Sequence, residues 1–201
     1  MILKSLEVIM FAAKRVLTTS LLFITLFLGS FSAHAFSGIP STYTVAGKQL
    51  VLNGSGTRTK FIISVYQMGL YLQKKSKNAN QIMNANEPMV VRLKIVSGFA
   101  SAEKMKHAIK QGFYSSTGGK TAPIQAQINQ LLVKGFASKI NKGDVFDLAY
   151  TPAGGTQVLK NGKALTVVKG LAFKRALFGI WLSGIPVQSS LKNELLGDRT
   201  F

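Results

Sequence analysis

An arginine and a tyrosine carry the most specific chemistry in this sequence. Arg58 precedes an apolar, β-branched run, Phe61–Leu72, which is typical of a buried strand. Alternation along that strand places Ile62 and Met68 on the same face as Tyr66. A guanidinium can pair with a carboxylate through two parallel hydrogen bonds, and a phenol can donate another. The pattern indicates a site for an anionic or carbonyl-bearing but otherwise apolar molecule. In the alternative interpretation, the arginine tethers a turn and the tyrosine packs in a core.

Composition argues against other kinds of site. His107 is the only histidine after residue 35 and the chain has no cysteine, so we expect no metal site, no disulfide and no cofactor. The acidic residues form no recognisable pair for hydrolysis. The segment Gly118-Gly119-Lys120-Thr121 is similar to the end of a phosphate-binding loop, but it lacks the first glycine and joins two expected helices.

The first 35 residues have the layout of a secretory signal peptide. Lys14 and Arg15 precede an apolar stretch, Val16–Leu28, and Ala33-His34-Ala35 is a small-residue cleavage site. The apolar stretch is shorter than the roughly 18 residues that a membrane span needs. This pattern favours cleavage over a permanent anchor.

We therefore expect cleavage near Ala35 and an exported protein, either periplasmic or secreted. Met1 and Met10 are both candidate start residues. Residues 36–201 are long enough for a single domain and contain no apolar stretch of transmembrane length.

The chain is strongly basic, with 25 Lys and Arg against 7 Asp and Glu, a net charge of +18. Such a charge favours anionic partners. The lysines are dispersed and no nucleic-acid-binding module is recognisable, so we do not expect nucleic-acid binding. One hypothesis is therefore an interaction protein that docks on an anionic envelope surface, with Arg58 in a structural role.

Hydrophobic periodicity and turn signals predict an α+β fold, an antiparallel sheet with helices on one face. The expected strands are Tyr43–Val51, Phe61–Leu72, Met89–Val96, Val145–Tyr150, Thr156–Leu159 and Ala164–Val168, with turns at Asn53–Gly56 and at Asn161-Gly162. The expected helices are one capped by Ser101 that runs to Tyr114, one from Pro123 to about Phe136, Leu171–Trp181, and Ser189–Leu196.

Four segments resemble the chalcone isomerase-like family: Leu52–Arg58, Tyr66–Leu72, Ser97–Gly112 and Arg175–Leu191. The resemblance extends from about Ala46 to Gly197. It implies an open-faced β-sandwich, in which helices are layered on one face of a large antiparallel sheet and a ligand cleft lies between them. The family includes isomerases that close a flavanone ring and non-catalytic relatives that bind fatty acids.

The resemblance also implies roles for individual residues. Arg58 matches an arginine that holds the attacking phenolate in the isomerases and the ligand carboxylate in the fatty-acid binders. Tyr66 matches a tyrosine of the fatty-acid binders, where the isomerases carry threonine. For the tyrosine that the isomerases carry near the start of a helix, only Lys104 is a plausible match. Ile180 stands where they use a second threonine.

Because this chain lacks the helix-start tyrosine and the second threonine of the isomerases, the resemblance favours a non-catalytic protein that binds a small amphipathic carboxylate, such as a fatty acid. Arg58 and Tyr66 would then hold the head group, and Ile62, Met68, Met105 and Ile109 the apolar tail. The alternative is an isomerase or intramolecular lyase acting on a chalcone-like or other enone substrate, with Arg58 and Lys104 as electrostatic groups.

Overall fold

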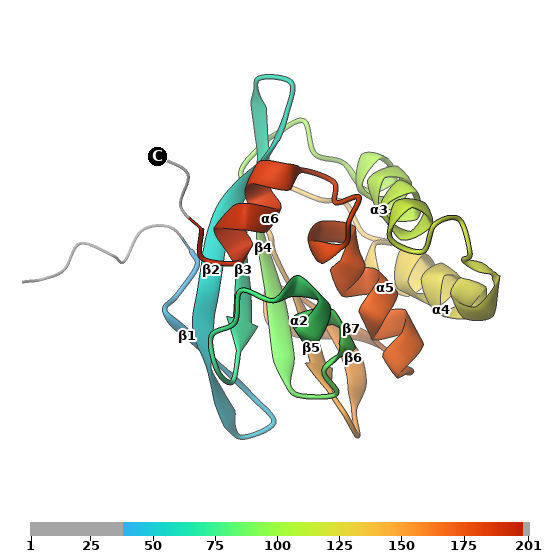
Figure 1. Ribbon diagram of the computed structural model, residues 1–201. Coiled ribbons are helices and arrows are strands. Elements are labelled where there is room, and N and C mark those ends of the chain that lie inside the picture. Colours follow the sequence, from blue (N-terminus) through green and yellow to red (C-terminus); the bar gives the residue numbers. More distant parts are fainter. Residues whose placement is uncertain (1–37, 199–201) are drawn as a thin grey trace, which may run out of the picture. The chain divides into compact units, whose positions relative to one another are not determined.

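The structure, a computed structural model, describes residues 38–198. This part of the chain forms a seven-stranded sheet in which strand order equals chain order and every neighbouring pair is antiparallel. The strands are β1 (Thr42–Val45), β2 (Lys48–Lys60), β3 (Ile63–Leu72), β4 (Met89–Ile95), β5 (Val145–Thr151), β6 (Gly155–Lys160) and β7 (Lys163–Val168). The helices are α2 (Ala79–Asn84), α3 (Ala102–Ser116), η1 (Ala122–Ile124), α4 (Gln125–Gln130), η2 (Leu131–Gly135), α5 (Leu171–Leu182) and α6 (Ser189–Leu195). The helices gather over one face of the sheet, which confirms the α+β prediction (Figure 1).

Side-chain alternation divides the sheet residues between two cores. On β4, Met89, Val91, Leu93 and Ile95 belong to the large core beneath the helices. Val90 faces the other way, into a small second core on the opposite face. The sequence pattern thus determines which face the helices cover.

Local signals predicted several elements correctly. Ser101 Oγ accepts a hydrogen bond from the Lys104 backbone N–H (3.3 Å) and caps α3. Asn161 and Gly162 have φ of 51° and 79° and form the two-residue turn between β6 and β7. The short helix α2 was not predicted from the sequence.

The first hairpins differ from the prediction. The expected turn at Asn53–Gly56 lies within β2, and the chain reverses instead at Phe61 and Ile62. The expected strand Tyr43–Val51 is divided by a turn at Ala46 and Gly47, which have φ of 46° and 72°. The Phe61–Leu72 prediction therefore placed Ile62 in a strand, whereas it occupies a loop.

The glycines of β2 allow a helix to approach, which explains the incorrect turn prediction. A Cβ on Gly54 would overlap the carbonyl oxygen of Glu194 and would lie 2.6 Å from that of Leu195. Asn53, which is buried, donates from Nδ2 to the Leu195 carbonyl (2.7 Å). These residues bind α6 closely to the strand, and only a residue without a side chain fits between them.

A buried lysine joins α5 to α2. Lys174 is wholly buried, and its Nζ donates to the carbonyls of Ile82 (2.9 Å), Met83 (3.0 Å) and Ala85 (2.8 Å). These carbonyls belong to the C-terminal end of α2, where backbone acceptors have no partner within the helix. Burial lowers the pKa of Lys174 to about 8, and the nearby charge of Arg175 acts in the same direction.

Within residues 38–198, none of the helices combines the length and hydrophobicity that a membrane span needs. The expected signal peptide, residues 1–35, lies outside the residues that the structure describes.

Candidate functional site

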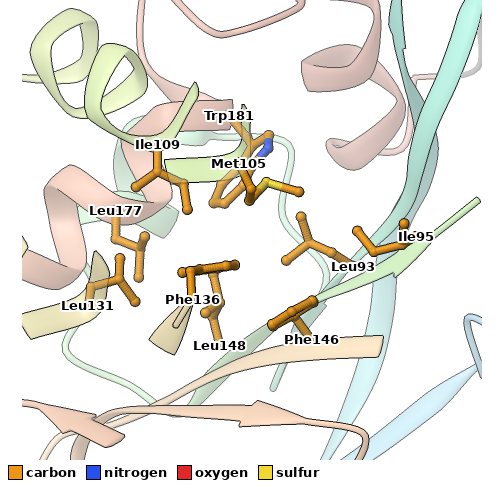
Figure 2. A pocket seen from close by; sticks show the side chains of 10 residues that line it. All are labelled: Leu93, Ile95, Met105, Ile109, Leu131, Phe136, Phe146, Leu148, Leu177 and Trp181. Atoms are coloured by element: carbon orange, nitrogen blue, oxygen red, sulfur yellow. The ribbon is translucent and has the colours of Figure 1, made fainter. Parts of the chain in front are cut away.

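A small apolar cavity lies between the sheet and the helices. Its lining comes from β4, β5, α3, η2, the residue that follows η2, and α5, and it comprises Leu93, Ile95, Met105, Ile109, Leu131, Phe136, Phe146, Leu148, Leu177 and Trp181. These side chains converge on one space, with Met105, Ile109 and Trp181 facing the sheet residues (Figure 2). The cavity volume is about 20 Å³, enough for a single water molecule. The helices are thus packed almost completely against the sheet.

A tyrosine hydroxyl meets the indole that lines this cavity. Trp181 Nε1 donates a hydrogen bond to Tyr66 Oη (2.9 Å). Tyr66 is only 7% exposed, and burial raises its pKa to about 12, although the Trp181 hydrogen bond and the Arg58 charge lower it in part. The hydroxyl therefore stays protonated at neutral pH. Within residues 38–198, Trp181 is its only hydrogen-bond partner, so the phenolic hydrogen has no acceptor in the described fold.

Arg58 stands directly opposite Tyr66 in the register of β2 and β3. The arginine is half-buried, and its Nη1 donates to Gln188 Oε1 (3.1 Å) and to the Thr59 carbonyl. No carboxylate of the described residues forms an ion pair with it. The guanidinium is therefore a partly desolvated cation whose protein partners are neutral.

A glutamine holds the arginine in place. Gln188 Oε1 also accepts from the Thr59 backbone N–H (2.9 Å), and its Nε2 donates to the Thr57 carbonyl (3.2 Å). Gln188 is the N-cap residue of α6, so it connects the start of that helix to β2. Its Oε1 occupies one position beside Arg58 that a carboxylate oxygen could take, because both are acceptors of similar size.

The structure brings together some of the residues predicted from the sequence. Arg58 and Tyr66 are neighbours, and Met105 and Ile109 both line the apolar cavity. Met68 is buried in the same core two residues beyond Tyr66 on β3, but it is not part of the cavity lining.

Two of the predicted site residues, Ile62 and Lys104, lie outside the cavity lining. Ile62 is 96% exposed at the turn between β2 and β3 and does not line the cavity, because β3 begins only at Ile63. Lys104 is exposed, and its Nζ donates to the Phe99 carbonyl (3.1 Å) instead of facing the cavity.

Sequence reasoning missed Gln188 and the role of Trp181. Trp181 is the single tryptophan of the chain, which was a signal for a structurally specific position. Gln188 carried no signal, because it meets Arg58 across 130 residues of sequence.

The comparisons with known proteins agree with this architecture. The model of the chalcone isomerase-like family matches residues 33–197. The chain belongs to the chalcone isomerase-like family. No curated protein sequence matches it.

Among solved structures, the chain is similar to the crystal structure of a fatty-acid-binding protein of Arabidopsis thaliana. The TM-score is 0.62 at 17% sequence identity, and the match covers 80% of this chain and 91% of the plant protein. At this identity, the likeness establishes a shared fold.

Proposed function

We propose that this protein binds a small amphipathic carboxylate, such as a fatty acid, between the sheet and the helices, and that it does so without catalysis. The observation that carries the proposal is the environment of Arg58. The arginine is a half-buried cation with only neutral partners, and it lies opposite a buried phenol that is bonded to the wall of an apolar cavity.

The head group fits the two polar residues. A carboxylate oxygen would replace Gln188 Oε1 at the guanidinium and form a charge-assisted hydrogen bond, which is roughly twice as strong as a neutral one. Tyr66 would donate its free phenolic hydrogen to the second oxygen. Both groups are on adjacent strands and are already oriented, so little ordering is needed on binding.

The tail needs more room than the cavity offers. Pockets that hold small ligands usually enclose roughly 300 Å³ or more, whereas this cavity encloses about 20 Å³. Binding therefore requires side chains to move apart. Met105 is suited to this, because it is only partly buried and its unbranched thioether adopts many conformations.

Two further points belong to this proposal. The plant protein of similar fold is a fatty-acid-binding protein, which supports a ligand of this class. The layout of residues 1–35 supports export, and we propose a periplasmic or secreted location.

A fluorescence titration tests the proposal. The probe is cis-parinaric acid, a fluorescent fatty acid, and the matched ligand is its methyl ester, which lacks the carboxylate. We expect the protein to bind the acid in preference to the ester. We expect Arg58→Ala to weaken binding of the acid about 10- to 100-fold, as loss of a charged hydrogen bond implies.

Two variants serve as controls. Arg175→Ala removes an exposed cation from α5 and should leave the affinity unchanged. Arg58→Lys keeps the positive charge but loses the planar guanidinium that can form two parallel hydrogen bonds, and we expect an intermediate affinity. Equal affinity of the native protein and Arg58→Ala, or equal affinity for acid and ester, would refute the proposal.

A further inference from the structure

The loop between β2 and β3 exposes consecutive apolar side chains. We call residues Lys60–Ile63 the hairpin tip. Phe61 is 91% exposed, Ile62 is 96% exposed, and Ile63 is also exposed. The tip projects beyond the rest of the sheet (Figure 1). Single exposed apolar residues are ordinary on a protein surface, but three in succession at the end of a projecting hairpin mark an interaction site.

The backbone at the tip is unfavourable for the residue it carries. Lys60 pairs with Ile63, so Phe61 and Ile62 form a two-residue loop. Phe61 has φ of 55°, a conformation that hairpin loops normally give to glycine or asparagine. Its side chain is exposed, so it gains nothing from packing within the described fold. A phenylalanine at this position suits contact with something outside the protein better than it suits the turn.

A second aromatic residue lies on the loop that is bonded to the same hairpin. The Val96 N–H donates to the Val65 carbonyl of β3 (3.1 Å), which connects the loop after β4 to the hairpin. That loop carries Phe99, which is 70% exposed. Lys104 Nζ is bonded to the Phe99 carbonyl, and Lys60 adjoins Phe61 in sequence. Phe61 and Phe99 thus each have a lysine beside them.

The positive charge of the chain favours an anionic lipid surface as the partner of the hairpin tip. Apolar and aromatic side chains with flanking lysines are the combination that enters the interface of a membrane with anionic lipids. The chain has a net charge of +18, which is complementary to such a surface and would disfavour a second copy of the same chain.

We propose that the hairpin tip inserts into the surface of an anionic lipid bilayer. Phe61 and Ile62 would enter the boundary between head groups and acyl chains, and Lys60 would remain among the phosphates. This inference goes beyond the proposed function and does not require it. If both hold, Arg58 and Tyr66, which lie on the two strands of the same hairpin, are presented close to the membrane.

Vesicle sedimentation tests the inference on protein free of added fatty acid. One set of vesicles mixes phosphatidylglycerol with phosphatidylcholine, and the other contains phosphatidylcholine alone. All variants share one N-terminus, verified by mass spectrometry, so that residues 1–35 affect each of them equally. We expect preferential binding to the anionic vesicles that weakens as salt is added.

The key variant combines Phe61→Gly with Ile62→Ser. We expect at least a tenfold loss of vesicle binding, because two apolar side chains no longer leave water. We also expect the melting temperature to hold or rise, because glycine adopts φ of 55° without strain. Vesicle binding would then fall without any loss of thermal stability, which a folding defect cannot produce.

Val133→Ser is the matched control. Val133 is also an exposed apolar residue, but it belongs to η2, and its replacement should leave vesicle binding unchanged. Equal binding by the native protein and the double variant would overturn the inference. Self-association of the native protein that the double variant loses, without vesicle binding, would also overturn it and assign the tip to a protein contact.

Discussion

The buried lysine of α5 leads to a prediction in which stability depends on pH. Replacing Lys174 with methionine leaves three carbonyls at the end of α2 without their donor. The bond to the Ile82 carbonyl is buried, whereas those to the Met83 and Ala85 carbonyls are partly buried. A buried group without a partner costs about 1–3 kcal/mol, and methionine removes the cost of burying a charge, so we expect a net loss of about 2 kcal/mol at pH 7.

The stability lost when methionine replaces Lys174 should grow with pH. The pKa of Lys174 is about 8 in the folded protein and 10.5 for an ordinary lysine, so between these values the unfolded chain binds more protons than the folded one. The contribution of Lys174 to the stability of the native protein therefore rises across this window, by about 2.5 kcal/mol between pH 7 and pH 10. The methionine variant has no such group, and the difference between the two proteins should widen by the same amount.

Urea unfolding followed by the fluorescence of Trp181 measures this difference, because the single tryptophan of the chain is buried. The other titrating groups are the same in both proteins and cancel in the comparison. Lys110→Met, at an exposed position of α3, should follow the native curve at both pH values. A difference that stays constant from pH 7 to pH 10, or that narrows, would refute the reasoning.

Three further substitutions test other parts of the structure. Tyr66→Phe removes the acceptor of the Trp181 indole and should lower the free energy of unfolding in urea by about 1–2 kcal/mol at pH 8. This difference from the native protein should shrink between pH 10 and 12, because native Tyr66, with a pKa of about 12, still holds a proton that the unfolded chain has lost. A difference that widens over this range would contradict the reasoning. Gly54→Ala should displace α6 from the Glu194 carbonyl and cost at least about 2 kcal/mol, seen as a lower melting temperature and faster amide exchange in α6; an unchanged melting temperature would count against the close packing. Thr156→Val removes a wholly buried hydroxyl that has no partner among the described residues and should raise stability by about 1 kcal/mol in the same unfolding assay, whereas a loss would mean that the hydroxyl is satisfied.

The sequence was informative where structure depends on residues close together in the chain. The cap of α3 by Ser101 and the turn at Asn161-Gly162 are local, and both were predicted. Met105 and Ile109 are four residues apart on the predicted helix after Ser101, so they share one helix face, and both line the cavity. Periodicity identified these features because a helix or a hairpin imposes it directly.

The sequence was misleading where a distant segment of the chain determines the role of a residue. Gly54 and Gly56 indicated a turn, but they are glycines because α6 lies against them. The same misjudged turn placed Ile62 in a strand and in the ligand site. Gln188, which accepts a hydrogen bond from Arg58, could not be predicted, because no local pattern encodes a contact across 130 residues.

The strand order has a consequence for how the site is assembled. Each strand pairs with the next one along the chain, so the longest loop that the sheet has to close is residues 96–144, between β4 and β5. The attachment of α6 is different, since its bond to Asn53 joins residues 142 positions apart. We expect this terminal helix to dock last during folding and to detach first in native fluctuations. Its detachment would withdraw Gln188 from Arg58 while the strands remain paired, so the step that we expect to end folding would also leave the guanidinium without its side-chain partner.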